Sequence, residues 1–225
     1  MKERIPTENQ ADLTTKLCRD IKERNPKIPL LINVSGCTGA GKSTWADRMT
    51  EDFKELGPPV VHISEDDFLQ PREYRESLRS KVYESGEWKG KTYWENHDNW
   101  LRLDLMREVI TNFKEGKNST YYPYQRATGT FSTEQKTVEP TDIVVFETSI
   151  FSELFDVLVL IDVDDDALLD RKLHRDSDLR DEETIRAYHK VQLDFWNRYK
   201  PTTPNYTIDN NDYNKPQLYS SNSYR

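Results

Sequence analysis

The chain has 225 residues, of which 35% are hydrophobic and 32% charged, as expected for one globular domain with a sizeable core. The formal net charge of −8 argues against a nucleic-acid partner, because the phosphates of a nucleic acid would need a basic face. No apolar run is long enough to span a membrane, and the N-terminus has no apolar signal core, so the sequence predicts a cytoplasmic protein with no membrane partner.

The chain begins with a polar stretch, residues 1–9, which we expect to be mobile. An amphipathic helix is predicted to follow, with Leu13, Leu17 and Ile21 on one face. It should end at Asn25, because the following proline disfavours the helical conformation there.

A strand, a glycine-rich loop and a helix are predicted next, in that order. Ile28 to Val34 is a short apolar run typical of a strand buried on both faces. Residues 36–44, GCTGAGKST, then match the phosphate-binding pattern G-x-x-x-x-G-K-[ST] at every fixed position. Apolar residues at helical spacing follow and stop at Gly57.

This loop predicts binding of a nucleoside triphosphate, taken as ATP, together with Mg²⁺. Its glycines let consecutive backbone N–H groups wrap around phosphate oxygens, Lys42 reaches the outer phosphates, and Ser43 offers its hydroxyl to the metal ion. We assign nucleotide binding to the whole loop: Gly36, Cys37, Thr38, Gly39, Ala40, Gly41, Lys42, Ser43 and Thr44.

The middle of the chain is less regular. A buried strand is predicted at Val60 to Ser64, followed directly by three acidic residues. Residues 71–98 show no apolar period and suggest an irregular insertion or lid, as long loops in compact domains are usually functional. A helix capped by Asp98 and Asn99 should run from Trp100 to about Lys114, before a polar, aromatic-rich segment.

The last third alternates strands and helices again. We predict strands at 143–146, 157–163 and 206–208 and helices from about 167 and over 182–199, and we expect the polar tail, residues 211–225, to be disordered or loosely packed. This alternation predicts an α/β protein of the P-loop NTPase fold: a doubly wound, mainly parallel sheet with helices on both faces and a lid. Ligands of such sheets bind at the carboxyl ends of the strands.

Carboxylates stand at three of these strand ends: residues 65–67, Glu147 and residues 162–166. Asp66 is our candidate for the base that takes the proton of an acceptor hydroxyl, with Asp67 as the competing choice. Glu147 ends a strand and could hold Mg²⁺ together with Ser43. The alternatives are a solvated loop carboxylate for Asp66 and a helix-capping role for Glu147.

A basic helix follows the fourth of these strands. Arg171 and Arg175 lie one helical turn apart and could close over the phosphate being transferred, with Lys172 and Arg180 nearby. Interleaved aspartates leave open the alternative of a salt-bridged surface helix.

Together these motifs resemble the uridine kinase branch of the phosphoribulokinase and uridine kinase family of P-loop small-molecule kinases. Ser64-x-Asp66-x-Phe68 is similar to the branch's S-x-D-x-F segment, Phe146-Glu147 to its F-E pair, and Arg171-Lys172-x-x-Arg175-Asp176 to its R-R-x-x-R-D lid. The resemblance implies a kinase domain at 28–210 after an N-terminal extension, 1–27, with an acceptor-binding insertion at 71–131 and a lid at 168–182. It also implies Asp66 as catalytic base, Lys42 and Arg175 as catalytic cations, and Arg171 and Arg180 as further nucleotide contacts.

The acceptor segment departs from the family pattern. Tyr122-Pro123-Tyr124-x-Arg126 takes the place of a P-x-Y-D segment that contacts the nucleoside, but Gln125 stands where the pattern has Asp, and Thr148 replaces the glycine after the glutamate. Glu95 or Asp98 could replace the carboxylate that holds ribose hydroxyls, and Tyr124 could instead be a core aromatic. The residues assigned to acceptor binding are Asp67, Glu95, Tyr124, Arg126 and Lys172.

The sequence therefore predicts ATP- and Mg²⁺-dependent phosphoryl transfer to a hydroxyl of a small polar acceptor, with a nucleoside such as uridine or cytidine first among the candidates. The alternatives are a P-loop kinase for a sugar phosphate, a vitamin-like alcohol, an antibiotic or a nucleotide sugar, and a nucleotide-dependent regulatory switch. Its expected partners are a nucleoside triphosphate and a small-molecule acceptor, and the sequence leaves room for a homo-oligomer.

Overall fold

The computed structural model describes residues 2–5 and 10–221. The chain forms two compact units. The sheet unit contains the chain up to Ile63 and from Thr141 onward, and the insert unit contains Ser64–Pro140.

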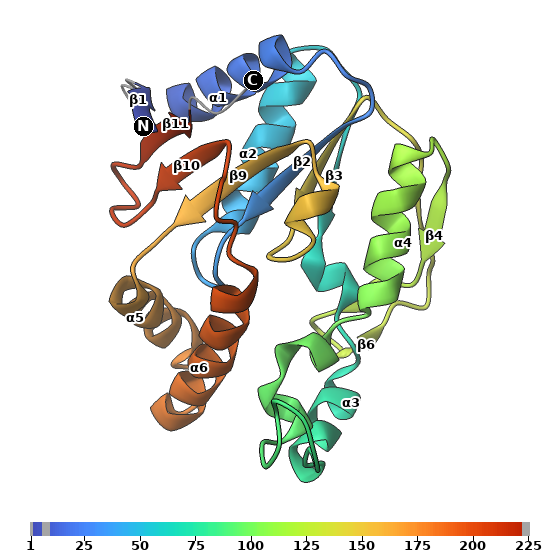
Figure 1. Ribbon diagram of the computed structural model, residues 1–225, viewed down its shortest axis with the longest axis vertical. Helices are drawn as coiled ribbons and strands as arrows, with labels where there is room; N and C mark the ends of the chain where they lie inside the picture. Colours follow the sequence, from blue (N-terminus) through green and yellow to red (C-terminus); the bar gives the residue numbers. More distant parts are fainter. Residues whose placement is uncertain (1, 6–9, 222–225) are drawn as a thin grey trace. The chain divides into compact units, whose positions relative to one another are not determined.

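Within the described residues, the sheet unit is built on a sheet of seven strands (Figure 1). The five strands predicted from the sequence are neighbours in this sheet. The order across the sheet is β1 (Lys2–Ile5), β11 (Gln217–Ser221), β10 (Tyr206–Asp209), β9 (Val157–Asp162), β2 (Leu30–Ser35), β8 (Ile143–Glu147) and β3 (Val60–Ser64). Strand β2 is parallel to β8 and β9, and β9 is parallel to β10, whereas β11 is antiparallel to both of its neighbours. This confirms the expected α/β class with a mainly parallel sheet.

The core of the sheet unit forms because its strands are apolar on both faces. Every residue of β2 and β8 is buried, as expected for central strands of a parallel sheet. On one face, Ile32 and Val34 belong to a cluster that includes Trp45 and Phe53 from the helix after the phosphate loop. The phosphate loop itself follows the carboxyl end of β2, between its two parallel neighbours.

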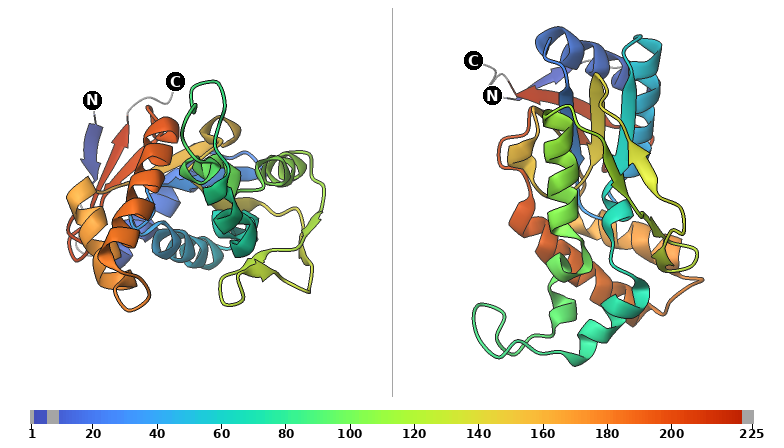
Figure 2. Two further views of the ribbon diagram at one scale, coloured as in Figure 1. Left: turned by 90° about the horizontal axis from the view of Figure 1, so that it is seen from below. Right: turned by 90° about the vertical axis from the view of Figure 1, so that its right-hand side faces the viewer.

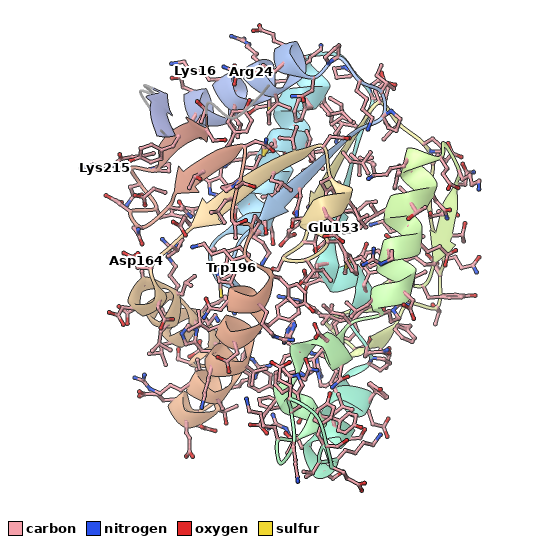
Figure 3. All side chains as sticks on the ribbon, in the orientation of Figure 1. Lys16, Arg24, Glu153, Asp164, Trp196 and Lys215 are labelled. Carbon is pink, nitrogen blue, oxygen red and sulfur yellow. The ribbon has the colours of Figure 1, made fainter. Side chains whose placement is uncertain are left out.

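Among the described residues, four α-helices belong to this unit: α1 (Gln10–Arg24), α2 (Lys42–Glu55), α5 (Asp165–Asp176) and α6 (Glu182–Tyr199). As predicted, Leu13, Leu17 and Ile21 are fully buried along one face of α1, which packs beside α2. Figures 1 and 2 show α5 and α6 side by side, and Figure 3 marks Asp164 at the start of α5 and Trp196 on α6.

Two expectations about the ends of the chain are wrong. Within 1–9, Lys2–Ile5 form strand β1, and within the tail, Gln217–Ser221 form β11 between β1 and β10. The tail carries few apolar residues, but antiparallel pairing satisfies its backbone polar groups, and Leu218 is completely buried. Residues 1, 6–9 and 222–225 lie outside the described part of the chain.

Leu218→Ala should lower the free energy of unfolding by about 2–5 kcal/mol, because it leaves a cavity in the core of the sheet unit. Leu179→Ala is the matched control, since the Leu179 side chain is 78% exposed. Urea denaturation measures both changes. Equal effects of the two substitutions would contradict the structural role assigned to β11.

The insert unit consists mainly of short elements. In chain order they are η1 (Glu65–Phe68), α3 (Arg72–Ser77), η2 (Leu78–Ser80), η3 (Tyr93–Glu95), η4 (His97–Trp100), α4 (Leu103–Lys114), the pair β4 (Ser119–Tyr121) and β7 (Lys136–Val138), and the pair β5 (Tyr124–Gln125) and β6 (Thr130–Phe131), where η marks a 3-10 turn.

The predicted helix cap at Asp98 and Asn99 is wrong, because α4 begins only at Leu103. Both residues lie in η4, whose start is capped by the Asn96 side chain accepting from the Asp98 backbone N–H. Leu101 then forms an isolated β-bridge with Leu69, which holds the backbone extended just before α4. This tertiary pairing overrides the local capping signal.

In the described ranges, 2–5 and 10–221, no helix combines the length and the apolar character that a membrane span requires.

Candidate active site

The phosphate loop, residues 36–44, has the backbone that its glycines allow. Gly39 and Gly41 adopt φ of 94° and 99°, left-handed values that favour glycine, and α2 begins directly after Gly41. At Gly36 the constraint is space, because a Cβ would lie 2.8 Å from the Ile161 carbonyl oxygen on β9. The loop thus leads into the N-terminus of a helix, where backbone N–H groups and the helix dipole favour an anion.

The loop is also held from outside. The fully buried Asn210 donates from Nδ2 to the Ala40 carbonyl at 2.8 Å. Arg171 in turn donates to the carbonyls of Asn210 and Asn211. The segment after β10 is therefore tied to both the loop and α5.

The catalytic lysine candidate lies over its own loop. Lys42 is buried, and its Nζ donates to the Gly36 carbonyl at 2.9 Å. The same carbonyl accepts from Ser149 Oγ at 3.1 Å. The Lys42 ammonium is thus held within the bend of the loop.

Ser43 and Glu147 form a pair suited to Mg²⁺. Ser43 Oγ donates to Glu147 Oε1 at 2.8 Å, and the Glu147 side chain is buried at the end of β8. A hydroxyl and a carboxylate are hard oxygen ligands, and Mg²⁺ in nucleotide sites takes one or two such groups and completes its shell with phosphate and water. The two residues fit the ion that the sequence predicted.

The electrostatics of Glu147 keep it ionised. Burial by itself would raise the pKa of this carboxyl, but His62, Lys42 and the Ser43 hydroxyl outweigh burial, so the pKa lies below its ordinary value. His62 on β3 has Nε2 3.7 Å from Glu147 Oε2 and Nδ1 3.0 Å from Asp47 Oδ1 on α2.

The basic residues on α5 and just after it contact different partners. Arg175 makes a two-point contact with Asp176, with N–O distances of 2.7 and 3.0 Å. Arg180 Nη1 lies 3.8 Å from Asp176 Oδ2, the oxygen that also accepts from Arg175 Nη2, and the Arg180 guanidinium lies over the Tyr188 ring. Arg171 and Arg175, predicted to share one target, have separate contacts in this structure.

Asp66 and Asp67 lie in η1 of the insert unit, immediately beyond β3. The Ser64 hydroxyl accepts from the Asp66 backbone N–H at 3.3 Å and so fixes the turn. The Asp66 side chain is 46% exposed, and its carboxylate forms an ion pair with Arg126 at 2.8 Å.

Asp67 has structural partners instead. Its Oδ2 accepts from Lys136 Nζ at 2.7 Å and from Tyr121 Oη at 3.1 Å. Arg102 donates to the Asp67 carbonyl at 2.6 Å, so η1 is tied to β4, β7 and the start of α4. The neighbouring carboxylates therefore differ in environment: one is accessible and the other is enclosed.

The predicted acceptor residues are all in the insert unit except Lys172. Tyr124 is nearly buried, and its hydroxyl accepts from Arg75 Nη2 at 2.8 Å, with the guanidinium over its ring. Glu95 forms a local capping box, accepting from the Thr92 backbone N–H and hydroxyl. Lys172 lies in the sheet unit among buried polar groups.

The model of the Phosphoribulokinase / Uridine kinase family matches residues 31–211, most of the chain. The chain belongs to this family. It is 29% identical over 185 residues to a Caenorhabditis elegans protein named "Probable uridine-cytidine kinase", covering 77% of this chain and 68% of that protein. A uridine kinase from Ureaplasma urealyticum is 21% identical over 212 residues, covering 89% of this chain and 97% of that protein.

A solved structure of phosphoribulokinase from Rhodobacter spheroides matches with a TM-score of 0.59 at 14% identity, covering 82% of this chain and 70% of that chain. A likeness at this identity shows the fold alone. Family membership makes the chain a P-loop small-molecule kinase, which confirms the predicted enzyme class.

Three residues near the phosphate loop were missed by sequence reasoning: Asn210, His62 and His189. Asn210 was within reach of the strand-end rule, because it follows β10 directly. The two histidines gave no such signal, since their importance depends on partners far away in the sequence.

Proposed function

We propose that this member of the phosphoribulokinase and uridine kinase family transfers the γ-phosphoryl group of ATP to a hydroxyl of a small polar acceptor, with a nucleoside such as uridine or cytidine as that acceptor. The observation that carries the proposal is the phosphate loop with Ser43 hydrogen-bonded to the buried, ionised Glu147. This arrangement suits a triphosphate that arrives with Mg²⁺.

The nucleotide end of the reaction is assigned to the sheet unit. Loop N–H groups bind the phosphates, and Lys42 moves its ammonium from the Gly36 carbonyl to the outer phosphates. Ser43 and Glu147 would hold Mg²⁺, which would neutralise phosphate charge when bound. Arg175, which pairs with the next residue, Asp176, is proposed to stabilise charge on the transferring group.

The acceptor end is assigned to the insert unit. Asp66 is proposed to take the proton from the attacking hydroxyl as the oxygen bonds to phosphorus and the bond to ADP breaks. Its exposure leaves the carboxylate open to an acceptor, whereas Asp67 is enclosed by Lys136 and Tyr121. Arg126 and Tyr124 are proposed to contact the acceptor. The relatives' names support a nucleoside in this role.

A second acceptor class is favoured by one observation. Arg126, an assigned acceptor residue, has its guanidinium 2.8 Å from Asp66, and Arg75 lies over the ring of Tyr124, so a second cation is next to another assigned residue. An acceptor with its own phosphate or carboxylate would pair with such cations. Sugar phosphates and related acids are therefore the second candidate.

The test is ADP release with ATP and Mg²⁺ against nucleosides, sugars, sugar phosphates and hydroxy acids, with mass spectrometry of the products. Stimulation by uridine or cytidine, with a monophosphate formed, supports the first candidate, and stimulation by an acidic acceptor replaces it with the second. Lys42→Met is the control and should abolish every positive signal. Nucleotide-dependent partner binding without any acceptor stimulation would contradict the kinase proposal and favour a switch.

The cellular location and the partners are part of this proposal. A cytoplasmic location fits the composition and the two cysteines, Cys18 and Cys37, both of which are buried and free. The expected partners are a nucleoside triphosphate and a small-molecule acceptor, with room for a homo-oligomer.

A further inference from the structure

A lysine is buried against the phosphate loop in the sheet unit. Lys172 on α5 is only 2% exposed, and a methyl group at Gly39 would lie 3.4 Å from its Cε. A buried ammonium is costly unless it is paired, so its contacts require an explanation. Its hydrogen-bond partners come from α6, and one of them is bonded in turn to the first turn of α5.

The contacts form a short chain of hydrogen bonds, which we call the lysine cluster: Lys172, His189, Gln192 and Asp165. Lys172 Nζ lies 2.9 Å from both His189 Nδ1 and Gln192 Oε1. On its other side, His189 Nε2 lies 2.6 Å from Asp165 Oδ1. Asp165 and Lys172 are on α5, whereas His189 and Gln192 are on α6.

The hydrogen bonds assign the protons. A charged lysine only donates, so His189 Nδ1 must accept and the imidazole proton must be on Nε2, donated to Asp165. Burial and the charge of Lys172 lower the pKa of His189, in keeping with a neutral ring. The Asp165 carboxylate therefore fixes the tautomer that receives the ammonium.

The pKa of Lys172 is lower than that of an ordinary lysine side chain. Burial, with the charges of Lys42 and Arg175, lowers its pKa to about 8, although Cys37 and Asp165 act in the opposite direction. Burial raises the pKa of the Cys37 thiol, so Cys37 acts on Lys172 in this way only at alkaline pH, where the thiol is ionised. The charged or titratable groups around the cluster are Cys37 and Lys42 from the loop, Asp165 and Arg175 from α5, and Arg186 and His189 from α6.

We propose that His189 and Asp165 are positioning residues that hold the Lys172 side chain against the phosphate loop. ATP binding is thereby coupled to protonation of Lys172. This inference rests on the proposed function for the nucleotide. Two of the three ammonium N–H groups are taken by His189 and Gln192, which leaves one for a phosphate oxygen.

The sign of the coupling follows from the charge of the ligand. Phosphates beside Lys172 favour its protonated form, so ATP binding raises the pKa of Lys172. Well below pH 8 nearly all of the lysine already carries its proton, so affinity is nearly constant. Above pH 8 the protein must take up a proton on binding, so affinity falls as pH rises. With a free-state pKa of about 8, Kd for ATP should be about tenfold higher at pH 9 than at pH 7.

The experiment is calorimetric titration of the full chain with ATP at saturating Mg²⁺, at pH 7, 8 and 9, in buffers of different ionisation enthalpy. We expect uptake of about 0.1 proton at pH 7 and about 0.9 at pH 9. Lys172→Arg should abolish the uptake and make Kd independent of pH within twofold, because a guanidinium stays charged. Lys190→Arg, on the exposed face of α6, is the matched control and should behave like the unmodified chain.

His189 is tested by a pair of substitutions. His189→Leu removes the acceptor for the ammonium, so the fall in affinity should begin at lower pH. His189→Asn places an amide oxygen near the former Nδ1 and should return the pH profile toward that of the unmodified chain. A residue with a merely structural role would change neither the proton count nor the midpoint.

The outcomes separate the two proposals. A constant Kd between pH 7 and 9, or proton uptake that persists in Lys172→Arg, would overturn the coupling and leave the kinase proposal intact. Absence of ATP binding at every pH would overturn the proposed function itself. If His189→Leu fails to fold, Lys172→Arg and His189→Asn still decide the question.

Discussion

Asp66→Asn should lower kcat by about 10²–10⁴-fold while leaving the Kd for ATP nearly unchanged. Asparagine keeps the shape of the side chain but cannot take a proton from the acceptor hydroxyl. The structural cost should be small, because the Asp66 side chain is 46% exposed and its recorded side-chain partner is Arg126. Steady-state turnover and calorimetric ATP binding measure the two quantities.

Asp67→Asn is the matched control, one residue further along the same turn. Its carboxylate accepts from Lys136 and Tyr121, so its loss should lower the free energy of unfolding by about 1–3 kcal/mol. We expect kcat to fall less than tenfold. The opposite pattern, an active Asp66→Asn and an inactive Asp67→Asn, would transfer the role of base to Asp67.

The parallel core of the fold could be predicted because its signals are local. The strands from Leu30 and Ile143 are unbroken apolar runs, and the structure buries every residue of both. The loop at 36–44 specifies its own backbone through glycines that reach left-handed φ. The helix predicted over 182–199 is also confirmed, as α6.

The edge of the sheet could not be predicted in the same way. β1 and β11 pair with each other although more than 200 residues separate them, for example Lys2 with Ser221. Neither segment has an apolar run, and in β11 only Leu218 and Ser220 are buried. Their stability comes from backbone pairing across the chain, which leaves no local pattern to detect.

The residues of the candidate site also differ in whether a local sequence signal predicts them. Ser43 and Glu147, 104 residues apart, were both predicted because one belongs to a loop motif and the other ends a strand. His189 and Gln192 lie within a regular helix, and their contact with Lys172 depends on how α5 and α6 pack. Periodicity predicts such a helix but not which of its polar side chains meets a partner.

The metal assignment leads to the second large effect: Glu147→Gln should raise the Mg²⁺ concentration that gives half-maximal turnover by about 10–100-fold. The substitution keeps the length of the side chain and a hydrogen-bonding oxygen for Ser43, but it removes the negative charge that Mg²⁺ prefers. Since the pKa of Glu147 lies below its ordinary value, the native carboxylate is ionised throughout the pH range of an assay, and the effect should not depend on pH between 6 and 8.

Turnover measured against Mg²⁺ at fixed ATP gives this value, and high Mg²⁺ should restore much of the lost rate. Glu153→Gln is the matched control, because Glu153 is exposed on the turn Ser152–Leu154 shortly after β8, where Figure 3 marks it. It should leave the Mg²⁺ requirement unchanged. If Glu147→Gln instead lowers turnover equally at every Mg²⁺ concentration, Glu147 supports the loop through Ser43 rather than the metal ion, and the magnesium ligands must be sought elsewhere.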